Sequence, residues 1–180
     1  MDRAADSYRR FLEGDRDAAE DVMGELFYPL IFFAERYVKD FHTAEDIALD
    51  VMSDLFTKIR FDFRVSLKTY LFTLAKSRAI DHIRHRKALP VTPLLEAEDR
   101  DSDARLEEIL IKNEEALALH RALGNLKEDM RAAVHLVYFG RMSYKEAAKV
   151  LGIRPKDVDN LLYRAKRILG DLLTKEGYTP

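Results

Sequence analysis

The chain has 180 residues, 47% of them hydrophobic and 34% charged, which is enough for one domain of ordinary size or two small ones with real cores. Its 30 lysines and arginines against 32 acidic residues give a net charge of −2, so the chain as a whole is not a polycation. It contains no cysteine, which excludes a disulfide framework and thiol chemistry.

The N-terminal stretch has no apolar core of the kind that signal peptides carry. The longest apolar run, residues 26–34, is far shorter than the ~20 residues that span a membrane, and it contains Pro29. We therefore expect a cytoplasmic protein with no membrane insertion. Because glycine is scarce and no strand-like alternation of apolar and polar residues is sustained, the expected fold class is all-α.

The first part of the chain predicts three helices. A short helix ends near Gly14, and a second begins one to three residues later with a long apolar stripe. Thr43 is expected to cap the third helix. That helix turns a ridge of three carboxylates outward, Asp46, Asp50 and Asp54. Like charges at this spacing fit either a solvated face or a surface that meets a basic partner.

Residues 61–87 combine an aromatic loop with a basic helix. Phe61 to Val65 lack helical spacing, and Ser66 is placed to cap a long helix behind them. Six cations lie along that helix: Lys68, Lys76, Arg78, Arg84, Arg86 and Lys87. Cations can bind the phosphates of single-stranded nucleic acid, and aromatic rings can stack on its bases, so this combination is typical of a single-strand binding surface. The alternative interpretation places Phe61 and Phe63 in the core and the cations on a solvated face.

Residues 88–104 break the helical pattern with two prolines and a run of acidic side chains, which predicts a flexible acidic linker. Helical spacing resumes at Arg105, and a further helix is expected from residue 127 to residue 139. The sequence therefore predicts an all-α protein of two small helical domains, 1–87 and 105–180, joined by this linker.

Residues 143–173 predict a helix-turn-helix in the second domain. Ser143 and Glu146 have the spacing of a capping box. Gly152 suits the left-handed turn after the first helix, and Pro155 suits the first turn of the second. One face of the second helix is apolar, and another is polar, basic and aromatic: Lys156, Asn160, Tyr163, Arg164 and Arg167. Such a face suits docking in the major groove of DNA, with a solvated surface hairpin as the alternative.

No arrangement of residues for catalysis is visible in the sequence. None of the five histidines follows a glutamate by three positions, so the di-metal signature of helical bundles is missing. His82 and His85 are three residues apart, but two histidines without a third ligand rarely hold a metal. We therefore expect a protein that is not an enzyme and that uses no metal or other cofactor.

Three segments occur in an order typical of one family: residues 44–51 (AEDIALDV), residues 66–84 (SLKTYLFTLAKSRAIDHIR) and residues 123–169. Joined by an acidic linker, they resemble an extracytoplasmic-function (ECF) sigma factor of bacterial RNA polymerase over nearly the whole chain. The resemblance implies that the first segment binds the polymerase clamp and the second melts and binds the minus-ten region of the promoter. The third would read the minus-thirty-five element. The implied partners are core RNA polymerase, promoter DNA and an inhibitory anti-sigma factor.

The resemblance implies three sets of site residues. The polymerase-binding set is Glu45, Asp46, Leu49, Asp50 and Asp54. The minus-ten set is Phe61, Phe63 and Arg64 as a base pocket, with Lys68, Lys76, Arg78, Arg84, Arg86 and Lys87 for phosphates. The minus-thirty-five set is Lys156, Asn160, Tyr163, Arg164 and Arg167. The family tends to place basic residues where this chain has Asp159 and Leu161, which predicts a weak or unusual reading of the minus-thirty-five element.

Two other functions fit parts of the pattern. A conventional helix-turn-helix regulator would act as a dimer on palindromic duplex DNA without polymerase. A helical scaffold or small enzyme with an incidental helix-turn-helix would give no promoter-dependent transcript. The sigma-factor hypothesis instead predicts weak duplex binding by the free chain, and selective transcription only after the chain is mixed with core polymerase.

Overall fold

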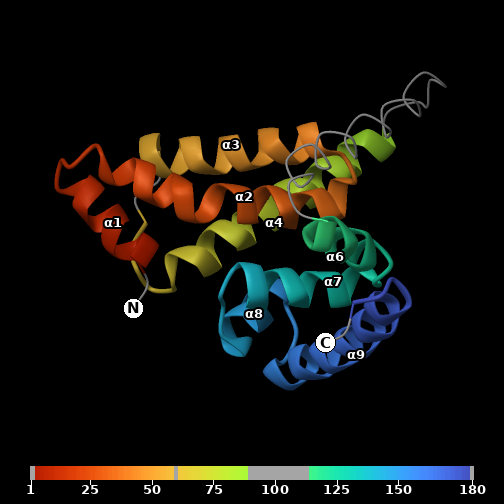
Figure 1. The fold of residues 1–180 in the computed structure, drawn as a ribbon. Coiled ribbons are helices and arrows are strands. Elements are labelled where there is room, and N and C mark those ends of the chain that lie inside the picture. The colour runs from red at the N-terminus through yellow and green to blue at the C-terminus, as the bar shows by residue number, and fades with distance from the viewer. Residues whose placement is uncertain (1–2, 59–60, 89–113, 179–180) are drawn as a thin grey trace.

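The computed structural model describes residues 3–58, 61–88 and 114–178, and these residues form helices without a strand (Figure 1). The N-terminal half holds α1 (Arg3–Leu12), α2 (Ala18–Val38), α3 (Phe41–Thr57) and α4 (Leu67–Ala88). The C-terminal half holds α6 (Glu114–Gly124), α7 (Glu128–Val134), the π-helical segment η2 (His135–Phe139), α8 (Tyr144–Leu151) and α9 (Pro155–Lys175). The all-α prediction is confirmed. The linker predicted for residues 88–104 lies, after its first residue, outside the described residues.

Short-range signals set most of the helix ends. α1 ends just before Gly14, whose φ of 105° favours glycine. Ser66 caps α4 as predicted, because its hydroxyl accepts a hydrogen bond from the amide of Thr69 at 3.2 Å. The prediction that Thr43 caps α3 is wrong. The helix begins earlier, and the carboxylate of Asp40 accepts a hydrogen bond from the amide of Thr43 at 2.7 Å; aspartate is at least as good an N-cap as threonine.

The N-terminal half packs one face of each helix into a shared core. α2 buries Leu26, Leu30 and Phe33 of its predicted apolar stripe. Phe33 meets Phe72 of α4 edge to face, with ring centroids 5.1 Å apart. Burying side chains of this size stabilises the fold by roughly 1.5–3 kcal/mol each relative to exposure. The core therefore fixes which face of α4 is left to carry its cations. In the described ranges, no helix is both long enough and apolar enough to cross a membrane.

The C-terminal half contains the predicted helix-turn-helix, formed by α8 and α9. The hydroxyl of Ser143 accepts a hydrogen bond from the amide of Glu146, and the Glu146 carboxylate accepts one from the amide of Ser143, so the capping box is confirmed. Gly152 ends α8 in the left-handed conformation with a φ of 76°. Val158 of α9 and Ala148 of α8 are both buried where the two helices approach. These local features place the polar face of α9 outward.

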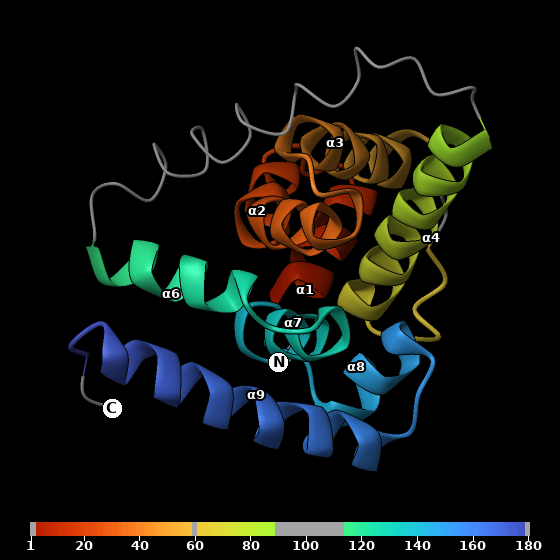
Figure 2. The ribbon, with the colours of Figure 1, turned by 90° about the vertical axis from the view of Figure 1, so that its right-hand side faces the viewer.

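The two halves lie against each other. α8 packs along α4, and α7 and η2 pack on α2, so that one hydrophobic core runs through both halves (Figure 2). α9 lies beyond α7 and α8, on the side away from α2 and α3 (Figure 2). The helix that carries the basic stretch of residues 66–87 is therefore covered along part of its length by the first helix of the helix-turn-helix.

Candidate nucleic-acid interface

α9 exposes all five residues that the sequence predicted for reading duplex DNA. Its buried face is formed by Val158, Leu162 and Ala165, and the opposite face is open to solvent. The exposed set is Lys156, Asn160, Tyr163, Arg164 and Arg167. Asp159 is exposed on the same helix. The helix can thus present an amide and guanidinium groups of the kind that contact adenine and guanine edges in the major groove.

The N-terminus of α9 is fixed by an ion pair that the sequence reasoning did not single out. The guanidinium of Arg154 donates to both carboxylate oxygens of Asp157, at 3.0 and 3.1 Å. These contacts hold the pKa of the Asp157 carboxyl below its usual range. The Asp157 carboxylate also accepts a hydrogen bond from the amide of Arg154 at 3.3 Å, which caps the helix. The first turn of the reading helix is therefore locally pre-organised.

The aromatic loop before α4 is packed more tightly than a base pocket requires. Phe61 is only 6% exposed, with its ring centroid 4.8 Å from that of Phe63 and 5.3 Å from that of Tyr70. Phe63 is half-buried at a φ of 59°, and the guanidinium of Arg9 lies 4.7 Å from its ring centroid. The Phe61 ring belongs to the core in this conformation. Arg64, by contrast, has a side chain that is 86% exposed and pairs with Asp62.

The six cations of α4 divide into two groups. Arg84, Arg86 and Lys87 are exposed at the C-terminal end of the helix. Arg84 lies 3.7 Å from Asp81, a surface pair that contributes little to stability. This end of α4 projects beyond the rest of the N-terminal helices (Figure 2). It is the part of the basic helix that lies most open to a nucleic-acid phosphate.

The other three cations of α4 are half-buried and already engaged. Lys68 pairs with Glu25 of α2 at 2.7 Å. Arg78 forms an ion pair with Asp54 of α3, and the hydrogen bonds from Lys58 and Arg78 hold the pKa of the Asp54 carboxyl below its usual range. The ammonium of Lys76 donates to two main-chain carbonyls of the C-terminal half, and burial lowers the pKa of this lysine. Sequence spacing placed all six cations on one helix but could not separate these groups.

The polymerase-binding residues predicted on α3 form a shorter edge than expected. Asp46, Leu49 and Asp50 are exposed, and Leu49 shows 47% of its surface. Glu45 is half-buried. Asp54 was expected to point outward, but it is half-buried because it turns toward α4 to meet Arg78. The exposed edge is therefore one apolar residue flanked by two carboxylates, of which Asp50 also lies 3.9 Å from Arg78 of α4.

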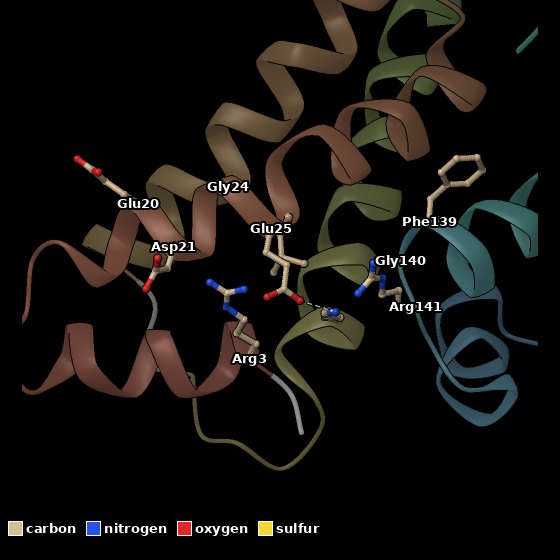
Figure 3. Close-up of a pocket in the computed structure, with 10 residues that line it drawn as sticks. Arg3, Glu20, Asp21, Gly24, Glu25, Phe139, Gly140 and Arg141 are labelled. Atoms are coloured by element: carbon tan, nitrogen blue, oxygen red, sulfur yellow. Dashed lines mark ion pairs between the residues drawn. The ribbon is translucent and has the colours of Figure 1, made fainter. Parts of the chain in front are cut away.

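A hollow of about 640 Å³ lies between α2 and the turn that follows η2 (Figure 3). Its walls carry three cations and three carboxylates: Arg3, Lys68, Arg141, Glu20, Asp21 and Glu25. Opposite charges in equal number give it no strong preference for an anion or a cation. Gly140 closes the turn, and Arg141 follows it in the left-handed conformation at a φ of 52°. Nothing in its lining points to one ligand.

A second hollow of about 520 Å³ lies between the halves and touches both candidate DNA-binding helices. Lys76 of α4 lines one side, and Asn160 and Arg164 of α9 line the other. Three carboxylates share the lining, from Glu128, Asp129 and Asp157. Among the described residues, no three histidine or carboxylate side chains are placed to hold a metal ion.

Two family models match the chain, one in each half. The model of sigma-70 region 2 matches residues 28–89, and the model of sigma-70 region 4 matches residues 116–169. The first range takes in the second half of α2 with α3 and α4, and the second runs from α6 into α9. The exposed cations of α4 and those of α9 therefore fall into separate matched regions.

Relatives and solved structures agree with these matches. The ECF RNA polymerase sigma factor RpoE of Cereibacter sphaeroides is 31% identical over 112 residues, which is 61% of each chain. RNA polymerase sigma factor YlaC of Bacillus subtilis is 25% identical over 163 residues, 89% of this chain and 94% of the relative. The structure of CnrH in complex with the cytosolic domain of CnrY superimposes with a TM-score of 0.59, at 22% identity and 97% of both chains.

The sigma factor RpoE in complex with the anti-sigma factor NepR, from Bartonella quintana, also has a TM-score of 0.59. It shares 21% of its sequence with this chain over 86% of this chain and 96% of its own length. At these identities the structural likeness shows a common fold, and the likeness extends across both halves and not over one of them alone.

Proposed function

We propose that this chain, which belongs to the extracytoplasmic-function sigma factors, binds core RNA polymerase, directs it to promoters and helps to open the DNA. The observation that carries the proposal is the order of the matches, region 2 before region 4, together with one exposed basic surface in each. The domain boundaries that we propose are 1–87 and 105–180, with 88–104 as the linker. The gap between the two matched ranges supports this division.

In the C-terminal domain, we assign the reading of the minus-thirty-five element to α9. Asn160 and Arg164 are one turn apart on the exposed face. An amide and a guanidinium at this spacing suit an adenine and a guanine on neighbouring steps of the major groove. Lys156 and Arg167 suit the flanking phosphates, which position the helix without specifying sequence. Tyr163 stands exposed between them and adds a large contact surface.

In the N-terminal domain, we propose that the exposed cations bind the minus-ten strand. Arg84, Arg86 and Lys87 would contact its phosphates, and Arg64 would contact a base or a phosphate at the loop. Phe61 takes a supporting role, since its buried ring holds the loop from beneath. Phe63 keeps part of its ring at the surface and is the candidate for stacking.

The edge of α3 formed by Asp46, Leu49 and Asp50 is our candidate for the polymerase contact. Two carboxylates around an exposed leucine suit a basic surface with an apolar centre. Glu45 lies beside them, whereas Asp54 is committed to Arg78 and acts by fixing α3 on α4. Because two structural neighbours are complexes with CnrY and with the anti-sigma factor NepR, we propose that an inhibitory protein also binds this chain.

Run-off transcription with purified core polymerase over a library of promoters tests the function directly. We expect promoter-specific transcripts only when the chain is added, and weak binding of the free chain to duplex DNA. Tight binding to a palindromic duplex without polymerase, with no promoter-specific transcript, would favour a conventional dimeric regulator instead.

Replacing Asp159 by lysine should strengthen binding to duplex DNA several-fold, because one repelling carboxylate is replaced by a phosphate ligand. The slope of log affinity against log salt concentration should steepen by about 0.9 for each additional phosphate that the protein neutralises. Asp171→Lys makes the same change on an exposed position twelve residues further along α9 and serves as the control. An affinity and a salt slope that stay unchanged would show that the Asp159 side chain points away from DNA.

Replacing Asp50 by lysine should lower the affinity for core polymerase by about tenfold, because a cation would then face the basic surface that we propose. Glu20→Lys reverses the charge of an exposed residue of α2 and is the matched control. Fluorescence titration of the labelled chain with core enzyme measures both. Equal affinities for the two variants would contradict the assignment of the α3 edge.

A further inference from the structure

The side chain of Arg9 in α1 lies over the aromatic loop that precedes α4. Its Cζ atom is 4.7 Å from the ring centroid of Phe63, which is within the range in which a guanidinium and an aromatic ring attract each other. The same guanidinium donates a hydrogen bond to the carboxylate of Asp6 at 2.9 Å. The Arg9 side chain is nevertheless 55% exposed. Phe63 therefore covers one side of the guanidinium and leaves the outer side open to solvent.

Contacts of its two neighbours in sequence fix Arg9 in this place. Tyr8 is fully buried, and its hydroxyl donates to the carbonyl of Leu55 in α3 at 3.2 Å. Arg10 pairs with Asp15 at 2.6 Å. In Figure 1, α1 lies beside the loop that leads into α4. The backbone that carries Arg9 is thus held against the loop before any ligand binds.

The loop beneath this guanidinium is also held in one shape. Phe63 has a φ of 59°, which is unfavourable for a bulky side chain and requires support from its surroundings. The Asp62 carboxylate gives that support, because it accepts hydrogen bonds from the amide of Arg64 at 3.1 Å and from its Nε at 3.0 Å. The ring centroids of Phe61 and Tyr8 lie 4.8 and 6.1 Å from that of Phe63. A base that binds here does not have to order the loop.

The position of Arg9 changes the surface that a base of the minus-ten strand would meet. Because the guanidinium lies over the ring, the outermost plane of the loop is that of Arg9 and not that of Phe63. Unstacked bases stack on guanidinium planes as well as on aromatic rings. A base on the outer side would place the cation between two π systems, and each of them attracts it.

We propose that Arg9 belongs to the minus-ten site: one unstacked base of the non-template strand stacks on the outer side of its guanidinium, with Phe63 beneath it. This assignment rests on the proposed function, because the ligand is the promoter single strand. It adds α1 to a site that otherwise consists of the loop and α4. Residue 9 precedes the range 28–89 that the model of sigma-70 region 2 matches, so the match itself assigns no role to α1.

Stacking and phosphate binding make different demands on this residue. A phosphate requires only a cation, which lysine also supplies, whereas stacking requires the planar guanidinium. Arg9→Lys should therefore weaken single-strand binding nearly as much as Arg9→Ala, by about five- to tenfold in each case. If Arg9→Lys binds as tightly as the native chain, Arg9 acts as a phosphate ligand and the stacking assignment is wrong.

Fluorescence anisotropy of a labelled oligonucleotide measures these affinities in the complex of the full chain with core polymerase. The probe is the non-template strand of the minus-ten region of a promoter that the native chain transcribes in the run-off assay. A series of probes each carries one abasic nucleotide, which keeps its phosphate but lacks a base. At one position, the missing base should cost the native complex about five- to tenfold and the Arg9→Ala complex almost nothing, because both changes remove the same contact. Additive losses at every position would overturn the assignment.

Arg16→Ala is the matched control, because it removes an exposed arginine from the turn between α1 and α2. It should change the affinity by less than about twofold, since an exposed charge that makes no contact is screened by salt. Circular dichroism checks that the variants are folded, and Arg9→Lys carries the test if Arg9→Ala is not.

The outcome for the native chain separates the two levels of the proposal. Promoter-specific transcripts together with native-like binding by both Arg9 variants would overturn the role of Arg9 alone. If the native chain gives no promoter-specific transcript, the proposed function fails, and the role of Arg9 fails with it.

Discussion

Replacing Gly140 by alanine should lower the free energy of unfolding by about 1–3 kcal/mol, because the added methyl group overlaps the main chain of the preceding turn. A Cβ at this position would lie 2.7 Å from the carbonyl oxygen of Leu136. The turn is fixed by hydrogen bonds from the amide of Gly140 to the carbonyl of His135, at 2.8 Å, and from the amide of Met142 to that of Leu136, at 3.0 Å. It cannot move aside without losing them.

Urea denaturation followed by helical circular dichroism measures this effect. Gly170→Ala is the matched control, since a Cβ at Gly170 in α9 would meet nothing within 4 Å. Alanine within a helix is favoured over glycine by roughly 0.5–1 kcal/mol, so this control should be as stable as the native chain or slightly more stable. If the two alanine variants unfold at the same denaturant concentration, the close contact at Gly140 does not constrain the turn.

The features that were predictable from sequence depend on residues within one or two helical turns. Ser143 and Glu146 are three positions apart, so their reciprocal hydrogen bonds follow from spacing alone. Gly152 likewise occupies a position that few other residues tolerate. Thr43 shows the limit of this reasoning, because Asp40 offers an equally good cap three residues earlier and takes the role.

The state of the basic helix could not be predicted in the same way. Whether Lys76 meets a phosphate or a carbonyl is decided by Val150, which lies 74 positions further along the chain. The ring of Phe61 is covered in part by Tyr8, which comes from another helix. Sequence spacing assigns such residues to a helix or a loop, but packing against distant elements decides which of them remain available.

The contact that Arg36 makes between the two halves could have been predicted from the sequence. Arg36 follows Phe33 by three positions, so it lies on the apolar stripe of α2 and not on its solvated face. A cation on a buried stripe requires a partner from another element. Here the partner is the carbonyl of Glu128, which could have indicated that the two halves meet at this point.

Acidification below pH 6.5 should lower the stability of the chain by at most about 1.4 kcal/mol per pH unit through His135. Burial, with smaller contributions from Arg36 and Arg131, lowers the pKa of His135 to about 3. Its ring is half-buried, but its Nδ1 has no exposed surface and no hydrogen-bond partner. The ordinary pKa near 6.5 applies in the unfolded chain, which therefore binds the proton first. The stabilisation is complete above pH 6.5 and is lost as the pH falls toward 3.

Between about pH 6.5 and pH 4.5 the effect of His135 on stability can be measured apart from that of the carboxylates. Asp54 and Glu146 have lowered pKa values, so the stabilisation that they contribute is lost only in more acidic solution. His135→Leu keeps an apolar side chain beside Phe139 and gives up no hydrogen bond at Nδ1, so its stability should change little over this range. His42→Asn, at an exposed position, should keep the slope of the free energy of unfolding against pH that the native chain shows. His120 also acts on His135. A slope that persists in His135→Leu would therefore assign the acid sensitivity to another group. Because Arg36 comes from α2 and His135 from η2, loss of the slope would instead mean that protonation acts where the two halves meet.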